Sequence, residues 1–248
     1  MINPSLAALC GLFLAASLPA ADVPASSIHP EADRLLRAAS DALTRTKAFS
    51  YKAEVWQDEL VDGHKVATTR TVETLVRRPD RVQMEVRSPK RSRGFWYDGQ
   101  TLTLLDRRNN LYGAIAVPGT IEALLDVAED EYGIRLPLED LLLNDPYASA
   151  MAGIKGGAYF GKVTVLGTPC EHIAFSTDRV DWQLWIEDGP NPLPRKLVIT
   201  YKQEPTQPQY TAIFSSWKLR SSLSDKTFTF VAPKGASQIE MLSALPTE

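Results

Sequence analysis

The most informative stretch of the chain is residues 49–77, FSYKAEVWQDELVDGHKVATTRTVETLVR. Apolar and polar residues alternate over 49–55, as they do in a strand that buries one face. Asp62 and Gly63 then supply the residue types of a tight hairpin turn, and residues 65–77 return as a second extended segment rich in threonine and valine. The stretch therefore predicts a long antiparallel hairpin.

Strand patterns with turn signals between them continue along the chain. Arg78-Pro79-Asp80 and Asp98-Gly99 are the next turns, and the first series of strands ends with Leu111–Ala116. Six later segments also have strand patterns: Ala158–Leu166, Cys170–Ser176, Val180–Glu187, Arg195–Lys202, Gln209–Trp217 and Lys226–Phe230. About eleven or twelve strands at hairpin spacing predict a mainly β fold, a sandwich or a barrel-like sheet. We expect one domain, because no low-complexity linker divides the chain.

Helical spacing occurs at the start and in the middle of the chain. Pro30 suits a first helical position, and an apolar stripe follows it up to Leu43. In the middle, residues 121–128 have apolar residues on one side and acidic residues on the other. Pro137 begins a second helical turn, and Asp145-Pro146 has the pattern of a cap and a first position for a third short helix. These four pieces are the candidate cover of the sheet.

A long curved sheet with so little helix to cover it suggests an apolar cavity beneath a lid, although a completely filled core gives the same pattern. Residues that alternate with polar neighbours are the candidate cavity wall: Val82, Met84, Val86, Trp182, Leu184, Ile186, Leu197 and Ile199. Apolar residues of the middle helices are the candidate lid: Ile121, Leu124, Leu125, Leu138, Leu141 and Leu142.

The N-terminus predicts export. Residues 6–18 form an apolar run that is too short to span a bilayer, and small residues follow it near positions 20 and 25. We therefore expect a signal peptide over 1–25, cleaved near 20 or 25, a single mature domain over 26–248 without a transmembrane segment, and a periplasmic location. The alternative is a buried N-terminal helix, since no lysine or arginine precedes the run. Cleavage would leave Cys170 as a lone cysteine, either inert in a strand or reactive.

Signs of catalysis are absent from the sequence. It contains no metalloprotease, nucleophile-elbow, redox-cysteine or phosphate-loop motif, and its three histidines, His29, His64 and His172, lie in unrelated segments. The acids near 126–131 are those of a solvated helix face. A net charge of −3 and a pI near 5.7 argue against a nucleic-acid partner. We expect neither an enzyme nor a bound metal or cofactor.

Residues 77–108 are the one basic region, with nine lysines or arginines against four acids. Such a rim suits anionic lipid headgroups or an acidic partner, and charges that keep edge strands soluble are the alternative. The candidate contacts are Arg78, Lys90, Arg91 and Arg93.

Three segments resemble a family of predicted periplasmic proteins of unknown function. They are FWYDGQTLTL at 95–104, DWQLWI at 181–186 with PLPRKLVITY at 192–201, and FTFVAPKGA at 228–236. The family is similar in pattern to the lipoprotein carriers LolA and LolB and to mycobacterial lipid carriers. This resemblance covers roughly residues 30–242. It implies an unclosed half-barrel of about eleven antiparallel strands, with helices plugging a concave apolar face that receives acyl chains.

Three functions are compatible with these features. The first is a carrier for a lipid or a lipidated protein. The second is an envelope sensor or interaction module that binds a protein of the inner or outer membrane. The third is an enzyme acting on a lipid-like substrate, which the lack of catalytic motifs disfavours.

Overall fold

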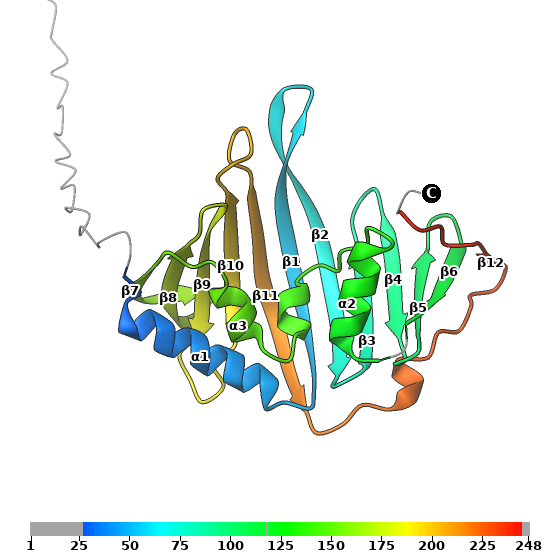
Figure 1. The fold of residues 1–248 in the computed structure, drawn as a ribbon, viewed down its shortest axis with the longest axis horizontal. Coiled ribbons are helices and arrows are strands. Elements are labelled where there is room, and N and C mark those ends of the chain that lie inside the picture. The colour runs from blue at the N-terminus through cyan, green and yellow to red at the C-terminus, as the bar shows by residue number, and fades with distance from the viewer. Residues whose placement is uncertain (1–26, 118, 245–248) are drawn as a thin grey trace, which may run out of the picture.

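A computed structural model describes residues 27–117 and 119–244. The expected signal peptide lies outside these residues, and no helix among them is long and apolar enough to cross a membrane. The described residues form one sheet of twelve strands with helices on one side (Figure 1). This arrangement confirms the predicted fold class.

The sheet is open, because its edge strands β12 and β7 are not paired with each other. The strand order is β12-β6-β5-β4-β3-β2-β1-β11-β10-β9-β8-β7. The pairings are antiparallel except that between β12 and β6, which is parallel. The bounds are β1 Ala48–Val61, β2 His64–Arg77, β3 Arg81–Arg87, β4 Ser92–Tyr97, β5 Thr101–Asp106, β6 Leu111–Ala116, β7 Gly156–Val165, β8 Thr168–Ser176, β9 Val180–Glu187, β10 Pro194–Tyr201, β11 Gln209–Arg220 and β12 Ser237–Gln238.

The hairpin β1–β2 lies at the centre of the sheet, as its long alternating sequence predicts. Its turn places Asp62 and Gly63 at φ 50° and 79°, the left-handed region that Asp-Gly turns adopt. Fourteen residues of each strand pair in continuous register, so the outer end of the hairpin projects beyond its neighbours (Figure 1).

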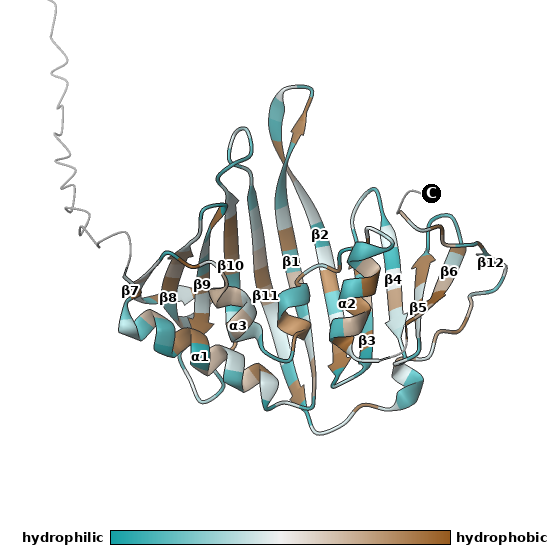
Figure 2. Cartoon of the chain, in the orientation of Figure 1, coloured by the Kyte–Doolittle hydropathy of each residue, from teal (hydrophilic) through white to brown (hydrophobic). Residues whose placement is uncertain are grey.

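The helices lie on the concave side of the sheet and divide the apolar interior into two main parts. They are α1 Pro30–Thr44, α2 Ile121–Asp130, α3 Pro146–Met151 and the short 3-10 helix η1 Glu139–Leu142. The larger core lies between α2, η1 and strands β1–β6, β10 and β11, and the smaller core lies between α1 and strands β8 and β9. Apolar residues accordingly recur on the strands behind the helices (Figure 2).

The prediction that Lys226–Phe230 form the last strand is wrong. Residues Asp225–Thr227 form a 3-10 helix, η2, and the chain then continues without strand pairing up to β12. The alternation in Phe228-Thr229-Phe230 does separate the two phenylalanine rings, and each ring packs against a different part of the chain. Phe228 is buried beneath the Arg77 guanidinium, and Phe230 contacts Trp96 and Tyr112 on the convex face.

Tyr97 holds the start of α2 against the sheet. Its hydroxyl lies 2.9 Å from the Val117 carbonyl and 3.0 Å from the Gly119 carbonyl. We expect Tyr97→Phe to lower the free energy of unfolding by about 1–2 kcal/mol, since buried carbonyls lose their donor. Thermal unfolding checks this, at roughly 2–4 °C per kcal/mol for a chain of this size. Tyr112→Phe is the control and should change little, because within residues 27–117 and 119–244 its hydroxyl makes one long, exposed contact, to Gln238.

Candidate functional site: an apolar hollow at one end of the half-barrel

The predicted wall residues are distributed over the two cores. Val82 and Met84 are fully buried in the larger core, where Val86 and Ile199 are partly buried against it. Leu184 and Ile186 lie with Trp182 in the smaller core beneath α1. Leu197 contacts both cores. The alternation thus identified side chains on the covered face, and their use as a ligand wall stays a prediction.

The predicted lid residues pack into the larger core. Leu124 and Leu142 are completely buried. Ile121, Leu125 and Leu138 are almost completely buried, and Leu141 is partly buried against the same core. Leu138 adopts a left-handed backbone, with φ 61°, and so the helical turn predicted from Pro137 begins only at Glu139. In this structure the lid side chains therefore fill the space that they cover.

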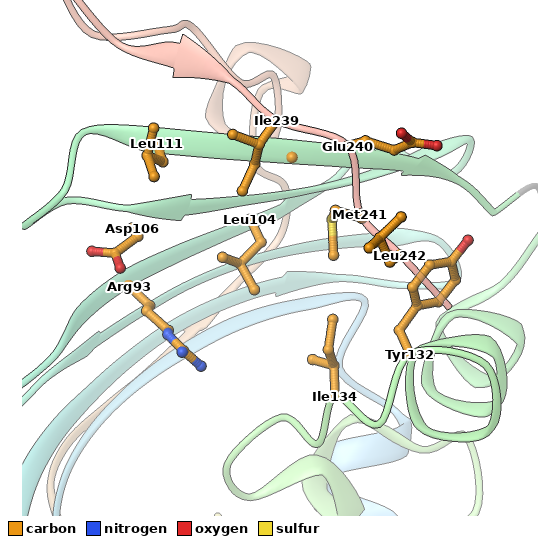
Figure 3. Close-up of a pocket in the computed structure, with 11 residues that line it drawn as sticks. Arg93, Leu104, Asp106, Leu111, Tyr132, Ile134, Ile239, Glu240, Met241 and Leu242 are labelled. Carbon is orange, nitrogen blue, oxygen red and sulfur yellow. The ribbon is translucent and has the colours of Figure 1, made fainter. Parts of the chain in front are cut away.

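A hollow of about 280 Å³ lies instead at the end of the half-barrel formed by β4, β5 and β6. Figure 3 shows Leu104, Ile134 and Met241 converging on it, with Arg93 at one side and the Glu240 carboxylate turned away. Its lining is Arg93, Leu104, Asp106, Leu111, Gly113, Tyr132, Ile134, Ile239, Glu240, Met241 and Leu242. The wall thus combines three parts of the chain, namely the sheet, the loop after α2 and the C-terminal tail.

The C-terminal tail closes this end of the sheet. Its backbone follows the edge of β6, where Ile239 N–H donates to the Tyr112 carbonyl at 2.8 Å. Met241 then packs onto Gly113 so closely that a Cβ on this glycine would lie 2.3 Å from the Met241 Cγ. Further on, Ala244 N–H donates to the Glu131 carbonyl at the end of α2. The tail therefore links the sheet edge to the end of α2 across the hollow.

Arg93 is the only one of the four predicted basic contacts that lines the hollow. Lys90 and Arg91 are exposed in the turn between β3 and β4. The partner of Arg93 across the β4–β5 pairing is Asp106. Burial opposes ionisation of Asp106, but hydrogen bonds from Asn109 and from the Arg108 and Asn109 amides hold its pKa below the usual value.

Arg78 belongs to a different part of the molecule, at the opposite end of β3. Its guanidinium donates to the Leu142 carbonyl at 2.6 Å and to the Leu141 carbonyl at 3.4 Å. Burial lowers the pKa of Arg78, and the Glu122 carboxylate partly opposes that shift. Arg78 therefore ties η1 to the turn after β2, and a headgroup role for it stays a prediction that this contact does not favour.

Reactive groups do not gather among the described residues. No three histidine, cysteine or carboxylate side chains there are placed to hold a metal ion. Cys170 is fully buried, and burial raises the pKa of its thiol, which keeps it protonated. His172 stacks on Trp185 with ring centroids 4.2 Å apart, and burial lowers its pKa.

An open, curved sheet with helices on its concave side and an apolar interior defines an unclosed half-barrel. The chain belongs to the family described as predicted periplasmic protein, DUF2092, which matches residues 32–242. This description agrees with the periplasmic location expected from the sequence. No curated protein matches the sequence significantly.

Solved structures with a similar fold come from several bacteria. Lipoprotein LppX of Mycobacterium tuberculosis has 12% identity and a TM-score of 0.47, over 79% of this chain and 99% of that chain. LprF from Mycobacterium bovis has 12% identity and a TM-score of 0.46, over 85% of this chain and 100% of that chain. A LolA superfamily protein from Nitrosomonas europaea has 12% identity and a TM-score of 0.37, over 80% of this chain and 97% of that chain. The likeness concerns the fold.

Sequence reasoning missed most of the hollow. Tyr132 and Ile134 lie in a loop, and the tail residues follow the last predicted strand, so no long periodic pattern marks them. The available signal was short: Ile239 and Met241 stand on either side of Glu240, a spacing that one more edge strand would also give.

Proposed function

We propose that this protein binds an acyl chain of a lipid or lipidated protein inside the half-barrel, without catalysis, and carries it through the periplasm. The observation that carries the proposal is the hollow beside Leu104, Ile134 and Met241, because these three side chains also pack against the larger core. A chain that enters the hollow thus meets the apolar interior directly. Movement of α2 and η1 would extend the space inward.

The size of the hollow limits what it holds without such movement. At about 280 Å³ it is slightly below the roughly 300–1,000 Å³ of ordinary ligand pockets. Each buried methylene contributes about 0.8 kcal/mol, so ten methylenes contribute about 8 kcal/mol before ordering costs. Micromolar binding corresponds to about 8 kcal/mol, and no specific polar motif is needed to approach it.

Lipid extraction tests the proposal most directly. The protein is purified from its native host, extracted into organic solvent and analysed by mass spectrometry. Acyl species in stoichiometric amount support the carrier. A protein that carries no lipid and binds none of a series of fatty-acid probes would remove it.

A tryptophan placed in the hollow should weaken the binding of long acyl chains more than the binding of short ones. We expect Ile134→Trp to weaken long-chain binding about tenfold, which corresponds to the exclusion of roughly two methylenes, and to affect short chains less. Displacement of a fluorescent fatty-acid probe measures both. Val163→Trp, on the exposed part of β7, is the control and should bind as the wild type does. Equal losses for all chain lengths would contradict a ligand in the hollow.

The projecting end of the β1–β2 hairpin favours a second candidate, an interaction module. Leu60 is 59% exposed on one face of the hairpin, and Val61 and Val66 are exposed on the other. Apolar side chains on both faces of a projecting tip suit insertion into a partner. A lipid-free protein that forms a tight complex with a membrane protein would support this candidate over the carrier.

A further inference from the structure

The central hairpin carries a length of strand edge that its neighbours do not reach. β1 pairs with β11 as far as Gln57, and β2 pairs with β3 only from Thr71 onward. Residues 58–70, called here the hairpin arm, therefore extend past both neighbouring strands (Figure 1). Among the described residues, no strand lies beside β2 over residues 64–70.

The turn of the hairpin decides which backbone groups face this open side. A two-residue turn makes Val61 and His64 a hydrogen-bonded pair, and from there the N–H and C=O groups alternate between the two sides of each strand. The backbone groups of Lys65, Ala67 and Thr69 therefore point away from β1, toward the position that β3 occupies lower in the sheet. Donors and acceptors repeated at every second residue are what an added strand pairs with.

The other edges of the sheet are protected against such pairing. The C-terminal tail covers β6 through β12. On β7, Ile28 bridges to Gly157, and the register is broken by a bulge between Tyr159 and Gly161. The arm has a continuous register, and residues 64–70 contain neither proline nor glycine. An edge of this kind is a template for a further strand.

The charge of the arm indicates which strand it accepts. Asp58 is paired with Lys65, with 2.9 Å between carboxylate and ammonium. Glu54, Glu59 and Asp62 make no ion pair within the part of the chain that the structure describes. Lysine or arginine on an added strand would complement these carboxylates, whereas an anionic lipid surface would be repelled by them.

A hollow of about 260 Å³ lies at the foot of the open edge. Its lining joins Thr69–Thr71 of β2 to Arg87–Pro89 at the end of β3, with Glu54 from β1. A strand added in line with β3 would end here, where Glu54 can meet a basic side chain. Arg87 does not neutralise Glu54, because its guanidinium pairs with Glu73 at 3.6 Å.

Exposed apolar side chains flank the same edge on both faces of the arm. Val66, on the edge strand itself, is 43% exposed. Trp56 is also exposed, and it lies opposite Thr69 in the β1–β2 pairing, on the other face from Val66. An added strand would therefore cover apolar surface with its own apolar side chains.

We propose that the open edge of β2 in the hairpin arm binds an extended segment of a partner protein as an additional strand, and that this segment carries apolar residues together with lysine or arginine. The inference goes beyond the carriage of an acyl chain and does not depend on it. It gives the second candidate function, an interaction module, a contact edge and a partner chemistry.

A synthetic peptide tests the proposal on the full protein. The probe is a fluorescently labelled heptapeptide, Lys-Val-Thr-Val-Lys-Val-Thr, and its partner probe has glutamate in place of both lysines. We expect the wild type to bind the basic peptide about fivefold more tightly than the acidic one. Nuclear magnetic resonance should show hydrogen exchange at the amides of Lys65, Ala67 and Thr69 slowed about tenfold by the basic peptide.

Variants of the edge separate backbone pairing from charge. Ala67→Pro removes one outward N–H without breaking the pairing of β1 with β2, and should weaken the basic peptide about tenfold. Ala67→Ser keeps that N–H and is the matched control, which should bind as the wild type does. Glu54→Gln should weaken the basic peptide about threefold and leave the acidic one unchanged or slightly tighter. All three variants should unfold near the wild-type temperature.

Several results would overturn the proposal. They are a wild type that binds neither peptide, equal binding of the two peptides, wild-type affinity in Ala67→Pro, and amide protection on β6 or β7 in place of β2. Protection of the arm by phosphatidylglycerol vesicles but not by the peptide would make the partner a membrane surface, and would also overturn it. Lipid extraction from Ala67→Pro should match the wild type, so the proposed carrier function is tested separately.

Discussion

On the proposed function, the double variant Leu124→Asp, Leu142→Asp should lose the lipid that the wild type carries and should keep most of its sheet. Both leucines are completely buried in the larger core, one on α2 and one on η1. An unpaired aspartate in such a place costs about 3–5 kcal/mol, unless the segment undocks and exposes the charge to water. Undocking limits the loss of stability to the free energy that holds the two segments on the sheet.

Few polar contacts hold these segments, which favours undocking over global unfolding. α2 is joined to the sheet region through the Ile121 amide, which donates to the Pro79 carbonyl at 2.9 Å, and through Tyr97. η1 is held by the Arg78 guanidinium. Neither segment takes part in the strand pairing of the sheet.

The measurement is lipid content by extraction together with circular dichroism of the strands. We expect lipid near background, a strand signal close to wild type and a lower unfolding temperature. Asp126→Ala, at an exposed position of the same helix, should retain lipid and stability. Cooperative loss of the strand signal in the double variant would mean that α2 and η1 are ordinary core and not a lid.

Local sequence patterns predicted most of the strands and helices, because turn and cap residues lie next to the elements that they bound, whereas the open half-barrel was implied by the family resemblance. The Asp62-Gly63 and Asp98-Gly99 turns lie between paired strands, and Thr120 and Asp145 cap α2 and α3 through their side chains. These are contacts between residues close in sequence. The last predicted strand failed for the opposite reason, since Phe230 meets rings on β4 and β6 that lie more than a hundred residues earlier.

The candidate site was harder to predict, because alternation tells which face a side chain takes and not what fills the space above it. Met84 and Ile186 both point to the covered face, yet they lie in separate cores. Whether space remains depends on how helices and tail settle on the sheet, which is a matter of long-range packing.

Truncation after Ala236 should have the second large effect, because the removed tail serves both the hollow and the sheet edge. It forms one wall of the hollow through Ile239, Met241 and Leu242. It also pairs with β6, where Ser237 and Gln238 lie opposite Leu111 and Tyr112. We expect the truncated chain to lose bound lipid and to associate through the uncovered edge of β6, since an unpaired edge strand is a template for another chain.

A matched variant separates these two roles of the tail. Ile239→Ser with Met241→Ser keeps the backbone that covers β6 but removes the apolar wall, so it should stay monomeric and still lose lipid. Its unfolding free energy should fall by about 1–2 kcal/mol, less than a fully buried pair would contribute, because Ile239 is 48% exposed. Lipid extraction and sedimentation measure the two effects separately. A truncated chain that stays monomeric and keeps its lipid would place the ligand away from the hollow, deeper beneath α2 and η1.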